Sequence, residues 1–319
     1  MRTYLVRRLV TAVPALVGTS LVLFVILALA PGDPFGELAT NPNVPPEVRM
    51  NLRKQFGLDD PIAVRYVRWL GSMVKGEWGF SFVSRVDVDR LILQRLPTTL
   101  FVLGSAQLLG LLIALPVGIY SARRPYSLFD QVATTFAFVG FSLPTFFTGL
   151  LFILLFSLYL DWLPFIYRAD LQVTGLRWVW ANFQQGIMPI AVLGLFQGAA
   201  LTRFVRSSVL EVIRLDYVST ARAKGLTEGV TLLKHVVRNA LIPVVTLIGL
   251  QAPLLIGGAV IMEQIFVIPG MGLLLLDAVT QRDYPIITGV FLIVGVAVML
   301  INLLVDLSYG VLDPKVRYR

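Results

Sequence analysis

Two scarcities set the class of this 319-residue chain before any motif is considered. It has no cysteine, which excludes a disulfide framework, a thiolate metal site and a cysteine nucleophile. Only 14% of its residues are charged, against about 25% in an average soluble domain. So few charges cannot cover a water-exposed surface, and the composition therefore indicates a membrane protein.

Long uncharged stretches stand where a soluble protein would carry polar surface. A helix needs roughly 20 apolar residues to cross about 30 Å of hydrocarbon, and six stretches are long enough. Because a helix satisfies its own backbone hydrogen bonds, the sequence predicts an all-α polytopic membrane protein with six transmembrane helices. The predicted spans are 9–30, 96–122, 131–160, 178–202, 239–262 and 284–305.

The predicted spans also lack ionisable side chains in their middle, where ion-coupled carriers usually place them. No Gly-x-x-x-x-Gly-Lys-Ser/Thr loop is present, so this chain is not expected to bind ATP phosphates. His235, its one histidine, is expected to pack or hydrogen-bond rather than to catalyse or bind a metal. Polar residues of the spans are expected to bond neighbouring helices or to contact substrate; they are Gln107, Ser142, Thr145, Gln197, Gln251 and Asn302.

The basic residues predict the orientation. The net charge is +8, and Lys and Arg gather at both ends and in the connections after the second and fourth predicted spans. Such residues favour the cytoplasmic side, so both termini are expected there. The first span is expected to be retained rather than cleaved, because it is longer than the core of a signal peptide. No basic run with interleaved aromatics suggests nucleic-acid binding.

The long connection between the first two spans is expected to fold outside the membrane. Pro45-Pro46-Glu47 and Asp60-Pro61 are typical helix starts, and Gly57 and Gly76 are plausible helix ends. This helix pair either lies on the membrane surface or lines an outer vestibule. The chain is therefore divided into two predicted parts: 1–95, the first span plus the outer loop, and 96–319, the core with five spans.

One predicted cytoplasmic connection, 208–242, has the features of a segment that a soluble partner can grip and through which the partner's motion is transmitted. Asp216 is a candidate N-cap, and Gly225 can adopt the left-handed conformation that ends a helix. A short helix between them would lie across the inner ends of the spans, with Ala221 and Gly225 as small positions that fit a partner's groove. An ordinary basic loop is the alternative. The candidate coupling residues are Asp216, Tyr217, Ala221, Arg222, Ala223, Lys224, Gly225 and Leu226.

The stretch 263–285 is a candidate outer gate. Residues 264–276 are apolar but too short to span, and Pro-Gly-Met-Gly interrupts them, which predicts a re-entrant or surface helix-turn. Apolar side chains there could close a pore by excluding water, or the segment is a plain interfacial loop. The candidate gate and pore residues are Ser142, Pro144, Thr145, Gln251, Pro269, Gly270, Met271 and Gly272.

Motifs spread over nearly the whole chain resemble one transport family. The cytoplasmic connection carries Asp-Tyr-Val at 216–218, Ala-Arg-Ala-Lys-Gly-Leu at 221–226 and Arg-Asn-Ala-Leu-Ile-Pro at 238–243; Ser-Leu-Pro-Thr-Phe stands at 142–146. These motifs resemble binding-protein-dependent ABC importer permeases of the dipeptide/oligopeptide (and nickel) branch. The general family signature reads Glu-Ala-Ala, three residues, then Gly; here only Ala221 and Gly225 keep it, so a contact of that glutamate is not expected.

The resemblance implies the type I ABC importer permease fold and the role of the first, B-like, inner-membrane subunit. It implies a second homologous permease, two cytoplasmic ABC ATPase subunits that use ATP and Mg²⁺, and an extracytoplasmic substrate-binding protein. This chain itself would hold no cofactor. The location would be a bacterial or archaeal cytoplasmic membrane. Peptides are the expected substrate, with nickel, glutathione or oligosaccharide as alternatives; an ion-coupled carrier, a membrane enzyme and a scaffold are the rival classes.

Overall fold

The computed structural model describes residues 2–30, 59–168, 173–251 and 259–312, together with 47, 50, 54, 57 and 253. These residues are helical or irregular, and they contain one isolated β-bridge, Phe80 with Asp87, and no strand. Five helices are long and apolar enough to cross a membrane, and a bent helix pair makes a possible sixth. The predicted all-α class is therefore confirmed. The helix expected at 45–57 falls mostly outside the described residues.

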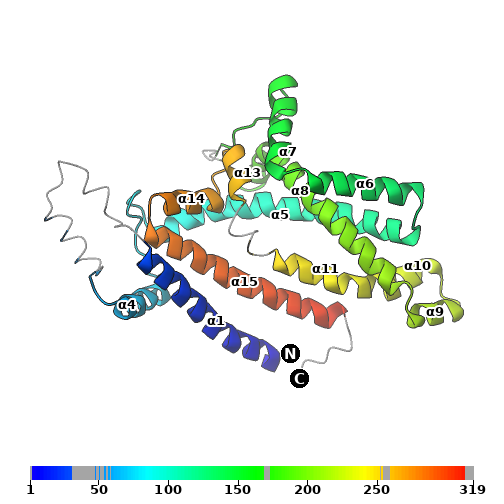
Figure 1. Cartoon of the computed structure of the whole chain (residues 1–319), viewed down its shortest axis with the longest axis horizontal. Helices are drawn as coiled ribbons and strands as arrows, with labels where there is room; N and C mark the ends of the chain where they lie inside the picture. Colours follow the sequence, from blue (N-terminus) through cyan, green and yellow to red (C-terminus); the bar gives the residue numbers. More distant parts are fainter. Residues whose placement is uncertain are drawn as a thin grey trace.

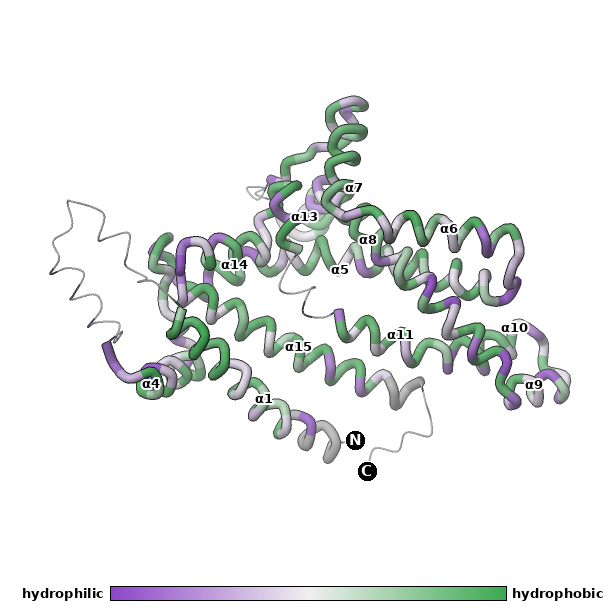
Figure 2. Tube along the Cα trace, viewed as in Figure 1, coloured by the Kyte–Doolittle hydropathy of each residue, from purple (hydrophilic) through white to green (hydrophobic). Residues whose placement is uncertain are grey.

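The long helices extend beyond the apolar windows that predicted them. The span predicted at 178–202, for example, is part of a helix that continues to Val212. Figure 1 shows the long helices roughly aligned along one axis, and Figure 2 shows that apolar residues dominate them. These helices are α1 Arg2–Leu29, α5 Val88–Arg123, α8 Leu176–Val212 and α15 Tyr284–Leu312.

The helices α5 and α8 pack against each other at the centre of the bundle, and glycines lie at their contact. A Cβ added at Gly110 would lie 3.1 Å from the backbone nitrogen of Gly198, and one at Gly194 would lie 2.7 Å from Leu109. The two backbones thus approach as closely as small residues allow.

The span predicted at 131–160 is not one straight helix. It consists of α6 Leu128–Ser142, α7 Thr145–Phe152 and the π-helix η1 Ile153–Tyr159, with a bend of 94° between α6 and α7. Pro144 explains the bend, because its ring disfavours a helical conformation in the preceding residue, and Leu143 is extended with ψ 131°. Figure 1 shows α7 pointing away from the other helices.

The span predicted at 239–262 is also shifted along the chain. A continuous helix, called the fifth helix below, begins within the connection 208–242 as α10 Glu228–Val230, widens into the π-helix η2 Thr231–Val237, and ends with α11 Arg238–Leu250. Pro243 lies inside α11, although the sequence placed it at the start of the span. Further along, residues 260–265 form the separate helix α13. The last part of the connection is therefore continuous with the helix of the fifth predicted span.

Short helices gather at the two ends of the bundle (Figure 1). We call the end that carries α9 Asp216–Ala223 the inner end, and the opposite one the outer end. The start of α1 and the end of α15 both point toward the inner end, where Arg8 Nε pairs with Asp306 Oδ2 at 2.9 Å. The short helices of the outer end are α4 Ile62–Lys75, α13 Val260–Ile265 and α14 Met271–Thr280.

The outer end is fastened to the long helices by polar contacts. The hydroxyl oxygen of Tyr66 in α4 lies 3.0 Å from the hydroxyl oxygen of Ser20 in α1, and the helix ends at Gly76 with φ +83°, as predicted. Asp283, just before α15, is 1% exposed. Its carboxylate accepts hydrogen bonds from the Ser81 hydroxyl and, at 3.2 Å, from the backbone N–H of Phe82. The loop before α5 is therefore held against α15.

Candidate coupling surface and outer turn

The short helix predicted in the connection 208–242 is present as α9. Leu215 occupies the N-cap position, so the expected cap at Asp216 is wrong by one residue; Asp216 instead lies in the first turn, where the helix dipole favours its charge. Gly225 has φ +80°, as predicted, and its N–H donates to the carbonyl of Arg222 at 2.9 Å. The left-handed residue turns the chain toward α10 and so fixes the length of α9.

One face of α9 is packed on the chain itself. Val218 is fully buried, in an inner cluster with the α8 residues Val205 and Val209 and the residues Val236 and Ala240 of the fifth helix. Burying a valine side chain contributes about 1.5–3 kcal/mol. The cluster packs α9 against both helices that flank it, so a displacement of α9 is expected to move α8 and the fifth helix as well.

Ala221 lies on the same buried face, with 5% of its surface exposed. The expectation that it enters a partner's groove is therefore wrong in its detail: a larger side chain would first meet the surface beneath α9. The other candidate coupling residues are exposed and form the outward face, and they are Asp216, Tyr217, Arg222, Ala223, Lys224, Gly225 and Leu226.

Polar contacts brace α9 against the start of the fifth helix. The Tyr217 hydroxyl donates to the His235 carbonyl at 3.2 Å and accepts from Asn239 Nδ2 at 3.0 Å. Arg222 Nε pairs with Glu228 Oε1 at 2.8 Å across the Gly225 turn. Both groups of this pair are partly exposed, so we assign it well under about 1 kcal/mol of stability and a role in shaping the turn.

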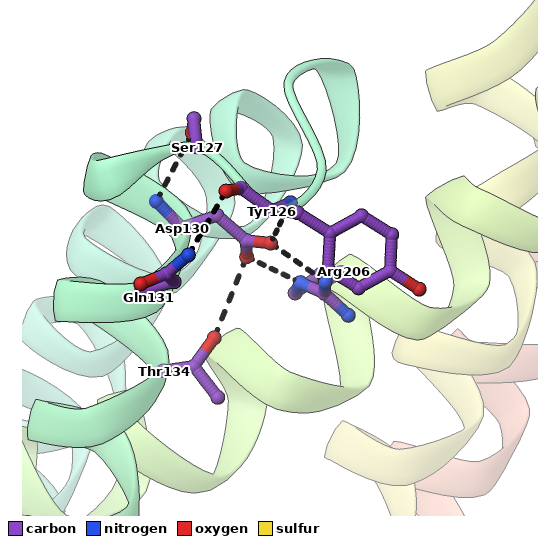
Figure 3. Close-up of polar contacts among 6 residues, drawn as sticks. All are labelled: Tyr126, Ser127, Asp130, Gln131, Thr134 and Arg206. Carbon is purple, nitrogen blue, oxygen red and sulfur yellow. Dashed lines mark hydrogen bonds and ion pairs between the residues drawn. The ribbon is translucent and has the colours of Figure 1, made fainter.

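An ion pair between a buried carboxylate and a partly exposed guanidinium joins α6 to α8 near the inner end (Figure 3). Asp130 accepts two hydrogen bonds from Arg206, from Nε at 2.6 Å and from Nη2 at 2.8 Å. The Asp130 carboxylate also accepts from the backbone N–H of Tyr126 at 2.8 Å, and its side chain is 4% exposed. Two parallel bonds between full charges make this the strongest type of side-chain contact. It ties α6 to the helix that carries α9.

A second buried carboxylate, Glu263, organises the predicted gate segment. Glu263 is 2% exposed; it accepts from the Thr99 hydroxyl at 3.1 Å and from the backbone N–H of Leu273 at 2.9 Å. Burial raises the pKa of the Glu263 carboxyl. Thr99 also accepts from the Met271 N–H at 2.7 Å, and a Cβ at Gly272 would lie 2.9 Å from the Glu263 carboxylate. The turn at 269–272 is thus wrapped around a carboxylate and fastened to α5.

The remaining pore candidates do not form one group. Ser142, Pro144 and Thr145 lie at the bend between α6 and α7, where the Ser142 hydroxyl bonds back to the Phe138 carbonyl at 2.8 Å. Gln251 instead follows the end of α11, and its side-chain oxygen is buried without a hydrogen-bond partner among the described residues. The α7 helix does reach the outer end, because a Cβ at its Gly149 would lie 3.3 Å from the Phe266 ring.

Comparison with known proteins assigns these elements to a family. A family model described as "Binding-protein-dependent transport system inner membrane component" matches residues 114–318, and a model of the N-terminal part of such components matches residues 1–103. The chain belongs to this family. It is therefore a membrane-embedded transport permease, and the resemblance seen in the sequence motifs is confirmed.

Relatives match this permease over its full length. It is 40% identical to the oligopeptide transport system permease protein AppB of Bacillus subtilis, over 100% of both chains. It is 36% identical to the dipeptide transport system permease protein DppB of Escherichia coli K12, again over 100% of both. It is 37% identical to the glutathione transport system permease protein GsiC of Salmonella paratyphi A, with the same coverage.

Sequence reasoning missed the partners of both buried carboxylates in this permease. Asp130 was placed just outside the third predicted span, although Ser127 three residues earlier is a cap signal, and the Asp130 N–H does donate to Ser127 Oγ at 3.3 Å. Arg206 lies 76 positions from Asp130, and no local pattern in the sequence links the two residues. For Glu263, the glycines that follow it were the available signal, because a turn that must wrap a carboxylate leaves no room for Cβ atoms.

Proposed function

We propose that this chain is the permease subunit of an ATP-driven ABC importer and forms half of a translocation pathway for di- and oligopeptides. The observation that carries the proposal is α9: a short helix seated on two long helices, with its polar face exposed at one end of the bundle. A soluble motor that grips such a helix moves α8 and the fifth helix with it. The family membership supports this assignment.

The chain itself is a non-catalytic subunit in this proposal. Two cytoplasmic ATPase subunits bind ATP and Mg²⁺ and contact α9, a second homologous permease completes the pore, and an extracytoplasmic receptor delivers substrate. The inner end faces the cytoplasm, with both termini on that side of a bacterial or archaeal inner membrane. The cluster of Lys and Arg between α8 and α11 supports this orientation.

Force would pass from α9 to the pore through rigid contacts. The α8 helix is continuous from Leu176 to Val212, so a displacement at its inner end moves its outer end as well. Glycine contacts pass this motion to α5, and the Asp130–Arg206 pair passes it to α6. At the outer end, Thr99 of α5 holds the 269–272 turn. ATP binding would draw the two coupling helices together and open the outer turn, and hydrolysis would reset it.

Peptides are the proposed cargo because the names of full-length relatives include oligopeptide and dipeptide transport. A glutathione transport relative has nearly the same identity, and glutathione is itself a small peptide. The ion pairs Arg8–Asp306 and Asp130–Arg206 both lie near the inner end rather than in the middle of the spans, which supports an external energy source rather than ion coupling.

The direct test is uptake in proteoliposomes that contain this chain, its partner permease and the ATPase subunits. We expect uptake of a radiolabelled dipeptide or oligopeptide only with internal ATP and external receptor. Uptake that needs neither and follows a proton or sodium gradient would instead establish an ion-coupled carrier. Receptor-dependent uptake of nickel or an oligosaccharide, but not of peptides, would keep the importer and replace the cargo.

A further inference from the structure

A hollow of about 400 Å³ lies between α5, α8 and the turn before α14, at the outer end. It is lined by Arg95 and Thr98 of α5, by Trp178 and Asn182 of α8, and by Tyr167, Arg168 and Pro269 of the connecting segments. The volume is within the usual range of roughly 300–1,000 Å³ for small-ligand sites. A hollow of this size accommodates one end of a short peptide rather than the surface of a protein.

The rim of this hollow is cationic. Arg95 and Arg168 contribute two guanidinium groups, and none of the described residues that line the hollow is an aspartate or glutamate. A guanidinium matches the two oxygens of a carboxylate with parallel hydrogen bonds, and two such groups on one small hollow favour an anion strongly. The charge pattern therefore selects a small anion.

The floor of the hollow is polar and fixed in place. Asn182 is 4% exposed; its side-chain oxygen accepts from the Tyr167 hydroxyl, and its Nδ2 donates to the Trp178 carbonyl at 2.7 Å. Burial raises the pKa of the Tyr167 phenol, so this group stays protonated and keeps its hydrogen bond to Asn182. The Trp178 ring is held edge-to-face against Phe101, with 5.7 Å between ring centroids. These buried contacts are those of a preformed site rather than of a loose surface groove.

The same hollow borders the outer turn. Pro269, which begins the turn, forms part of its wall, and Thr98 precedes the residue that fastens the turn to α5. Thr99 bonds both Glu263 and the Met271 N–H, so α5 carries the hollow on one side and the turn on the other. A ligand in the hollow would therefore contact the segment proposed as the gate.

We propose that this hollow is a carboxylate subsite that binds the C-terminal carboxylate of a peptide as the peptide leaves the receptor. Arg95 and Arg168 bind the carboxylate oxygens, and Trp178 packs on the last peptide residue. This inference rests on the proposed function, because it needs peptide cargo that arrives at the outer end. It adds a specificity element in the permease to the selection made by the receptor.

The test compares two peptides on the purified full importer. A photoreactive tripeptide with a free C-terminal carboxylate and the same tripeptide with a C-terminal amide are offered without receptor, so that the receptor's own selectivity does not enter. We expect the wild-type chain to be labelled about tenfold more by the free carboxylate, since one charge-assisted contact contributes enough for that ratio. Arg95→Gln/Arg168→Gln should lose this preference.

Arg177→Gln is the matched control, because it removes an exposed arginine of α8 that does not line the hollow. We expect it to keep the tenfold preference, and we expect the double variant to remain inserted in the membrane and to co-purify with the other subunits. An unchanged preference in the double variant overturns the subsite, as does equal labelling of the wild type by both peptides. Loss of receptor pull-down and of stimulated hydrolysis in the double variant would show that the arginines bind the receptor instead.

The peptide cargo and the carboxylate subsite can be disproved separately. If the wild-type importer takes up receptor-delivered peptide but shows no carboxylate preference, only the subsite is wrong. If it takes up no peptide at all, the proposed cargo is wrong and the subsite with it.

Discussion

The two ends of this permease each bury a carboxylate, but they hold it in different ways. At the inner end, Asp130 faces a full positive charge and accepts two hydrogen bonds from Arg206. At the outer end, Glu263 is held by the Thr99 hydroxyl and the Leu273 N–H, which are neutral donors. The first arrangement joins two long helices, and the second fixes a turn.

This difference indicates which end moves as a block and which end opens. Separating this bidentate ion pair would leave the buried Asp130 carboxylate without its cation, so α6 and α8 are expected to stay together. Neutral hydrogen bonds around Glu263 can be exchanged for water when the turn opens. The inner end therefore transmits motion, and the outer end responds to it.

The largest effect is expected for Arg206→Ala, which leaves the Asp130 carboxylate buried without its cation. We expect a loss of about 3 kcal/mol in unfolding free energy, measured by thermal unfolding of the chain in detergent. The matched variant Asp130→Leu/Arg206→Leu removes both charges and should regain most of the stability. It should not regain receptor-dependent uptake, because packing alone does not hold α6 to α8 in register. Full uptake by this double variant would contradict a transmitting role for the pair.

Ala221→Trp tests the seat of α9. Because Ala221 is 5% exposed and faces the chain, the indole should lift α9 from the inner cluster, with an overpacking cost of about 1–3 kcal/mol. We expect no ATP-driven uptake, loss of the ATPase subunits in pull-down, and normal insertion in the membrane. Ala221→Ser, which changes little in volume, should transport normally. Wild-type uptake by the tryptophan variant would show that α9 does not need this seat.

Gly225→Val tests the turn that ends α9. No atom lies within 4 Å of a Cβ added here, so the effect should come from the backbone alone, at φ +80°. Holding a residue with a Cβ in the left-handed region costs roughly 1–2 kcal/mol, and uptake should fall while the chain remains inserted. Gly225→Asn is the control, because asparagine tolerates this region. Equal uptake by the two variants would remove the conformational argument.

The smallest effect is expected at the outer end and depends on pH. Since burial raises the pKa of Glu263 in the folded chain, the folded state binds more protons than the unfolded state between the ordinary and the raised value. Stability should therefore fall as pH rises through this window and be greatest below it. Glu263→Gln should flatten this part of the profile, measured by thermal unfolding in buffers of increasing pH. An identical profile in the glutamine variant would mean that Glu263 does not titrate there.

Elements set by local physics were predictable from the sequence. Uncharged runs located the long helices, a glycine placed the end of α4, and Gly225 was expected in the left-handed region it occupies.

Elements set by distant contacts were not predictable. The Asp130–Arg206 pair joins residues 76 positions apart, and Thr99 meets Glu263 across 164 positions. The inward orientation of Ala221 depends on how α9 sits on two helices, which a linear motif does not specify. The bend at Pro144 had a local signal, but the uncharged run around it outweighed that signal in the prediction.

The central claim, that α9 is gripped by the ATPase at the inner end, can be tested by site-directed crosslinking. The chain has no cysteine, so single cysteines give no background. Thr220→Cys lies on the exposed face of α9, and Asp277→Cys lies on the exposed face of α14 at the outer end. In the assembled, uptake-competent importer, we expect Thr220→Cys to crosslink to the ATPase subunit and Asp277→Cys not to. A crosslink from Asp277→Cys, or none from Thr220→Cys in an importer that still transports, would contradict the account.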